Sequence, residues 1–172
     1  VTIPIRAKAL ALRDAEGHTT LWITADLVGF DRPLMTILKD RIVSKHGLPR
    51  DAIALFASHT HTGPAIKNVA RTLAEVGRDT ALARANTEYR LTLEDRLVGL
   101  ADAALAALAP ADLAFGAGQA PFALNRREKQ PDGTFRIGKN PTGPTDKSVP
   151  VLRVAMKRRA ITMKRRTRWG HA

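Results

Sequence analysis

The chain has 172 residues, a formal net charge of +12 at pH 7, 44% hydrophobic residues and no cysteine. This length and apolar content predict one soluble globular domain with a real core, and the lack of cysteine excludes disulfides and thiolate metal sites. The sequence has no run of about 18 apolar residues and does not begin with a basic segment followed by an apolar one, so we expect neither a transmembrane segment nor a signal peptide, and the cellular location stays open.

The first segments predict a β-hairpin. Residues 5–12 alternate between apolar and polar or small side chains, Glu16-Gly17 marks a turn, and residues 19–28 are rich in β-forming types. Asp26 is a carboxylate within the apolar second strand, and a buried carboxylate needs a partner. That partner is either the second ring nitrogen of a metal-bound histidine or, with equal weight, the turn that follows the strand.

Residues 31–57 predict a helix followed by a buried strand. Asp31 has the features of an N-cap, Pro33 falls in the first turn, and apolar residues recur at helical spacing until Gly47 ends the run. The apolar run 52–57 is too short for a typical helix, so we expect a buried strand there.

The middle of the chain predicts one long helix. Charged residues and Gly77 interrupt the pattern of residues 65–86, so we expect a loop with helical pieces. Thr87 to Ala109 carries one apolar face at helical spacing, and Pro110 follows its end, which indicates a long packed helix.

The remaining segments complete an α/β chain with a partial mixed β-sheet and flanking helices. Residues 113–117 and 149–154 have the composition of short strands. Residues 125–149 are polar and rich in Gly and Pro, and we expect no regular structure in most of this stretch. The sequence does not define the strand order, but an incomplete sheet leaves an unpaired edge, so we expect self-association through that edge.

The most informative motif is His59-Thr60-His61, which closely follows the predicted strand. In extended backbone, residues i and i+2 face the same side, so both imidazoles can present a nitrogen to one cavity. Neutral imidazole is a common zinc ligand, and a catalytic zinc ion activates a bound water. The motif therefore indicates a zinc-dependent hydrolytic site at His59 and His61, although two polar loop residues would give the same short pattern.

Asn125-Arg126 follows the short apolar stretch 121–124. A guanidinium at Arg126 could stabilise an oxyanion or hold a substrate oxygen. The neighbouring Arg127 and Lys129 fit equally well with an ordinary surface arginine.

Taken together, these segments resemble the neutral/alkaline nonlysosomal ceramidase family, in the amino-terminal part of its catalytic domain. The resemblance covers about residues 4–155. Four stretches carry it, in the order that the family has: residues 25–29, 59–64, 125–126 and 149–154. The block that begins at His59 is the specific one, and its Thr62 stands where the family usually has serine, so a hydroxyl is kept.

The resemblance implies a zinc-dependent amidase that cleaves ceramide, an N-acylsphingosine, to sphingosine and a fatty acid. It implies that His59 is a zinc ligand, that His61 contacts the substrate or polarises its carbonyl, and that Arg126 helps to hold the oxyanion. Asp26 is the candidate carboxylate behind the zinc-bound histidine. The expected partner is a ceramide-like lipid amide.

The chain departs from the family after residue 155. Members of the family continue there into strands that contribute a second zinc histidine, and later a glutamate and a tyrosine, and none of these follows here. A catalytic zinc ion needs three protein ligands. We therefore expect residues 1–155 to form a partial ceramidase-like catalytic domain that is inactive by itself, and residues 156–172 to form a basic tail that is disordered or frame-shifted.

The tail also supports an alternative interpretation. Seven Lys and Arg residues and no acidic residue occur from Lys157 onward, so the rest of the chain carries only +5. Such a tail, with Trp169 available for stacking, suits a module that binds nucleic acid or an anionic membrane. No recognised nucleic-acid-binding signature accompanies it, and a charge run is more often a solvated tail, so nucleic acid is not the partner we expect.

Overall fold

The computed structural model describes residues 4–64, 66 and 80–156. The chain divides into two compact units, Val1–Leu108 and Ala109–Ala172. Within the described residues, no helix combines the length and the apolar character that crossing a membrane requires.

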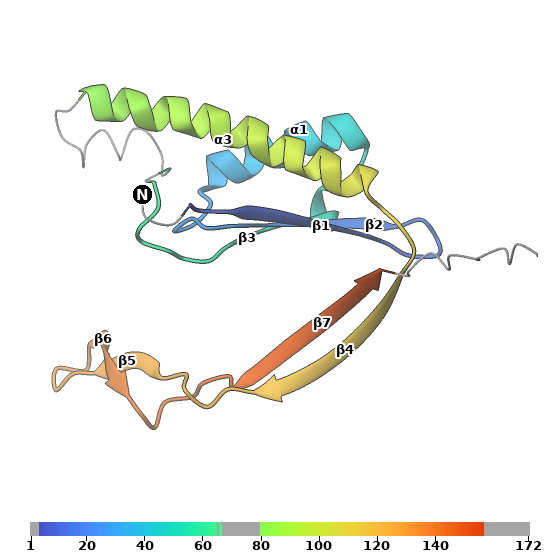
Figure 1. The fold of residues 1–172 in the computed structure, drawn as a ribbon. Coiled ribbons are helices and arrows are strands. Elements are labelled where there is room, and N and C mark those ends of the chain that lie inside the picture. The colour runs from blue at the N-terminus through green and yellow to red at the C-terminus, as the bar shows by residue number, and fades with distance from the viewer. Residues whose placement is uncertain (1–3, 65, 67–79, 157–172) are drawn as a thin grey trace, which may run out of the picture. The chain divides into compact units, whose positions relative to one another are not determined.

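The first unit contains a three-stranded mixed sheet (Figure 1). Strands β1 (Ala7–Arg13) and β2 (Thr19–Ala25) form the predicted antiparallel hairpin. A short 3-10 turn, η1 (Arg50–Ala52), leads into β3 (Ile53–Ala57), which pairs with β2 in parallel. The α/β class with a mixed sheet and flanking helices is thus confirmed at this coarse level, and β2 lies in the centre of the sheet.

Helix α1 (Arg32–His46) has the two end signals that the sequence predicted. Asp31 is the N-cap, and one of its carboxylate oxygens accepts a hydrogen bond from the backbone N–H of Leu34 at 2.9 Å. Gly47 ends the helix in the left-handed region at φ 67°, and its N–H donates to the carbonyl of Val43 at 2.8 Å. The boundaries of α1 therefore follow from local chemistry.

Helix α3 (Thr80–Ala106) lies with α1 on one face of the sheet, and together they enclose the core (Figure 1). It already includes Thr80, before the predicted start at Thr87, and residues 67–79 of the predicted loop lie outside the described residues. Alternate residues of β2 point into this core, as a strand period of two requires. The largest fully buried side chains are Leu21, Ile23, Leu27, Leu34, Leu38, Ile42, Ile53 and Leu97.

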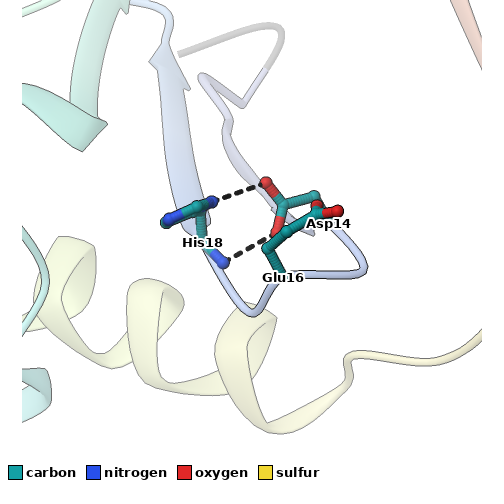
Figure 2. A group of neighbouring side chains, drawn as sticks. All are labelled: Asp14, Glu16 and His18. Atoms are coloured by element: carbon teal, nitrogen blue, oxygen red, sulfur yellow. Dashed lines mark hydrogen bonds and ion pairs between the residues drawn. The ribbon is translucent and has the colours of Figure 1, made fainter.

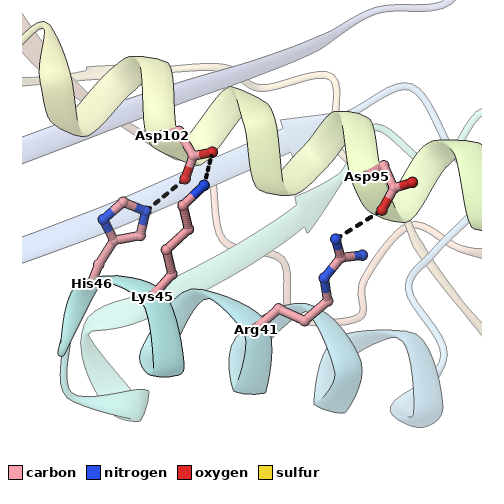
Figure 3. Close-up of polar contacts among 5 residues, drawn as sticks. All are labelled: Arg41, Lys45, His46, Asp95 and Asp102. Atoms are coloured by element: carbon pink, nitrogen blue, oxygen red, sulfur yellow. Dashed lines mark hydrogen bonds and ion pairs between the residues drawn. The ribbon is translucent and has the colours of Figure 1, made fainter.

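Ion pairs join α1 to α3 at the edge of this core (Figure 3). The Arg41 guanidinium lies 2.7 Å from the Asp95 carboxylate. Asp102 receives Lys45 Nζ at 2.6 Å on one oxygen and His46 Nε2 at 2.7 Å on the other. The hydrogen bonds from Lys45 and then His46 lower the pKa of Asp102 below its usual value.

The second unit consists of two antiparallel strand pairs. Strand β4 (Ala111–Gln119) pairs with β7 (Ser148–Met156), and both contain the strands that the sequence predicted. Strand β5 (Asn125–Lys129) pairs with β6 (Phe135–Asn140), so the prediction of no regular structure there is wrong. The turn between them supplies the reason, because Gln130 N–H donates to the Thr134 carbonyl at 2.8 Å and Gly133 adopts φ 83°.

Candidate functional site

The histidine motif lies just beyond the carboxyl end of β3, as the sequence predicted. Because β2 and β3 are parallel, the same edge of the sheet also holds the end of β2 and the residue that follows it, Asp26. The N–H of Ser58 donates to the carbonyl of Ala25 at 3.1 Å and continues the ladder by one bond. Ligands of open α/β sheets commonly bind outside the carboxyl ends of such strands.

His59 does not have the extended backbone that the sequence predicted. Its φ is 61°, and it is the only non-glycine residue with a positive φ in the described part of the chain. Such conformations cost about 1–3 kcal/mol and concentrate at functional sites. The prediction that a strand aligns His59 with His61 is therefore wrong, but the turn brings their rings edge to face with centroids 5.0 Å apart.

The His59 ring is oriented by the backbone. Its Nδ1 lies 2.7 Å from the carbonyl oxygen of Val28. A carbonyl only accepts, so Nδ1 carries the proton and donates, which leaves the lone pair of the neutral ring on Nε2. A metal-binding histidine commonly has this arrangement, with one nitrogen fixed by a carbonyl and the other available to the ion.

Asp26 has a partner that neither interpretation of the sequence named. Its Oδ2 accepts the backbone N–H of Arg6 at 2.9 Å, and its own N–H donates to the Arg6 carbonyl at 2.8 Å. Gly63 of the histidine loop approaches Asp26 so closely that an added Cβ would lie 3.3 Å from the Asp26 carbonyl oxygen. Asp26 therefore joins the start of β1 to the end of β2 and lies against the histidine loop.

A cavity of about 260 Å³ lies beside Asp26. Its walls are mainly apolar and include Leu93 and Leu97 of α3, while Tyr89 and Arg96 add polar groups. Burial raises the pKa of the Tyr89 hydroxyl, and the charge of Arg96 opposes that shift. An apolar group with a polar end fits this lining.

Arg126 belongs to the second unit and lies in β5 at a register irregularity. Its side chain is exposed, and its Nε donates to the carbonyl of Gly138 in β6 at 2.9 Å. The preceding Asn125 donates its amide to the carbonyl of Pro144 at 2.9 Å. Arg126 thus joins the two strands of its hairpin, Asn125 joins β5 to the segment after β6, and the oxyanion role of Arg126 stays a prediction.

The residues that the structure describes do not fit a complete zinc site at the motif. Neither His59 nor His61 belongs to a described group of three His, Asp or Glu residues close enough to share an ion. Catalytic zinc needs three protein ligands and a position for water. His59 therefore has the geometry of one ligand only, and we derive no catalytic step through zinc.

Among the described residues, one such group of three does occur, at the turn between β1 and β2 (Figure 2). The ligand atoms of Asp14, Glu16 and His18 lie within 4.8 Å of one another, and all three residues are exposed. Partial desolvation raises the pKa of Asp14, but the hydrogen bonds and charge of His18 outweigh it, so the pKa lies below its usual value. This group was not predicted from the sequence, although Asp14, Glu16 and His18 follow one another at a spacing of two residues around the predicted turn.

No family model matches this chain, and no match was found among the curated proteins or the solved structures. The ceramidase resemblance therefore stays a prediction that depends on the motif. The basic tail from Lys157 onward lies outside the described residues, and so does any site that it forms.

Proposed function

We propose that this chain carries His59 and His61 as parts of an N-acyl amide hydrolase site of the ceramide type. His59 serves as a metal ligand through Nε2, and His61 contacts the substrate beside it. The observation that carries this proposal is the Nδ1 contact of His59 with the Val28 carbonyl, made from a strained left-handed backbone.

The cavity beside Asp26 supports the substrate class. Its leucine side chains can accept part of an apolar chain, and Tyr89 and Arg96 can hydrogen-bond to a hydroxyl or carbonyl of a lipid amide. Asp26 lines this cavity, and its carbonyl also lies against Gly63 of the histidine loop.

We also propose that the chain by itself binds zinc weakly and does not turn over ceramide. Two imidazoles give fewer ligands than the three that a catalytic zinc ion needs. Zinc-dependent cleavage of a fluorescent ceramide checks this proposal, and we expect no turnover above that of zinc alone. If the chain cleaves ceramide and His59→Ala abolishes that cleavage, the proposal that the chain is inactive is wrong, but the assignment of His59 to the site is strengthened.

Imidazole nitrogen spectra of the 15N-labelled chain test the ligand role independently of activity. Without metal, we expect His59 to carry its proton on Nδ1, and added zinc should shift its Nε2 resonance. The matched control is His18→Ala, which removes the histidine of the exposed turn cluster and should leave the His59 response unchanged. A proton on His59 Nε2, or a zinc response confined to His18, would refute the proposal.

A further inference from the structure

The β5–β6 hairpin has one face that combines cations with apolar side chains. In its register, Arg127 pairs with Ile137, and Lys129 pairs with Phe135. Directly paired residues of antiparallel strands lie on the same face, and residues two apart on one regular strand share that face. We call these four residues the basic-apolar face.

The acidic residue of these strands lies on the other face. Glu128 pairs with Arg136, one position away from the residues of the basic-apolar face. A Cβ added at Gly138 would collide with the Glu128 side chain, so this carboxylate lies across Gly138. The basic-apolar face thus carries two cations, Arg127 and Lys129, and no carboxylate, and its charge complements an anionic surface.

Both apolar side chains of this face are open to solvent. Ile137 is 84% exposed and Phe135 is 54% exposed. The Arg127 guanidinium lies 4.9 Å from the centroid of the Phe135 ring, so the cation and the ring form one surface. Apolar side chains surrounded by Lys and Arg are typical of proteins that bind the interface of an anionic membrane.

These contacts favour a lipid surface over single-stranded nucleic acid. Nucleic-acid surfaces use free aromatic faces on which bases stack. Here Arg127 occupies one side of the Phe135 ring, and the most exposed apolar residue, Ile137, is aliphatic. An aliphatic side chain gains free energy by entering the acyl region of a bilayer.

The hairpin holds this face in place through its own bonds. Thr134 donates its N–H to the Asp132 carboxylate at 2.9 Å within the turn. The Asn140 amide donates to the Arg127 carbonyl at 3.1 Å across the two strands. These bonds fix the turn and join the two strands that carry the face.

We propose that the basic-apolar face docks on an anionic phospholipid bilayer. The ammonium group of Lys129 and the guanidinium group of Arg127 contact lipid phosphates, and Ile137 enters the boundary of the acyl chains. This inference does not rest on the proposed amidase function, because it uses only residues of the β5–β6 hairpin.

The test is co-sedimentation of the full chain with phosphatidylcholine vesicles with and without phosphatidylglycerol. Lys129→Ser and Arg136→Ser form a matched pair, since each removes one cation from the same hairpin on opposite faces. We expect binding only to the anionic vesicles, weakened about fivefold by Lys129→Ser and little changed by Arg136→Ser. If both variants lost the same amount of vesicle binding, the proposal would be overturned, because net charge or the basic tail would then explain the binding.

The apolar contribution is measured with Ile137→Ser, which keeps the charge and should weaken binding by about tenfold. Val151→Ser is its control on the β4–β7 pair and should bind like the original chain. Unchanged binding of Ile137→Ser would overturn the proposal. So would tighter binding to single-stranded DNA than to vesicles, or a concentration-dependent dimer that Ile137→Ser dissolves, since these outcomes assign the face to another partner.

Discussion

The two units differ in how far their apolar side chains are buried. In the first, Leu21 and Leu38 have no exposed surface, because two helices cover the central strand of a sheet. In the second, Leu113 is 59% exposed and Phe115 is 75% exposed, and no described side chain of that unit is fully buried. Strand pairs without a covering layer are marginal in water. We therefore infer that the stability of this chain resides mainly in its first unit.

The largest expected effect comes from Leu21→Ala in β2. It removes a fully buried side chain and should lower the free energy of unfolding by about 2–5 kcal/mol, measured by urea denaturation. Leu113→Ala is the control in β4 and should change that free energy by less than about 0.5 kcal/mol. If the two variants lost similar free energies of unfolding, the contrast between the units would be wrong, since Leu113 would then have to be buried in solution.

The same contrast explains how far the sequence predicted the fold. Helix α1 could be predicted to its ends because Asp31, Pro33 and Gly47 act through local backbone bonds. The β5–β6 hairpin could not, because cations and apolar residues share one face and the register shifts between Asn125 and Arg127. Periodicity needs a buried face to reveal it, and this hairpin has none.

The position of the candidate histidines in the fold was predicted from the sequence, but their geometry was not. The apolar run before the motif placed the end of β3 correctly, yet it gave no sign of the left-handed backbone at His59. The bond from His59 to Val28 depends on the parallel pairing of β2 and β3, which joins segments far apart in sequence. Sequence patterns describe neighbours along the chain, and this contact is not local.

A smaller effect is expected from Asp31→Ala, which tests how much the N-cap of α1 adds to the stability of the first unit. The variant removes the oxygen that accepts the Leu34 N–H. It should lower the free energy of unfolding, measured by urea denaturation, by about 1 kcal/mol. It also removes the carboxylate 3.5 Å from Arg90. Asp31→Asn separates the two roles, because it keeps the cap and loses the charge. If Asn costs as much as Ala, the ion pair rather than the cap is responsible.

The smallest effect is expected from Asp102→Asn, which tests whether ion pairs rather than burial stabilise the first unit. At pH 7 the free energy of unfolding should fall by only about 0.5 kcal/mol, because the Asp102 side chain is 31% exposed and solvent screens its ion pairs. Lys45 and His46 lower the folded pKa of Asp102 below the ordinary 3.8, so its stabilisation is fully present above 3.8 and is lost as the pH falls further, through the folded pKa. Urea midpoints of the two chains should therefore converge as the pH falls from 7 to well below 3.8. A constant difference over that range would mean that the carboxylate charge contributes nothing, and burial alone would then account for the contrast between the units.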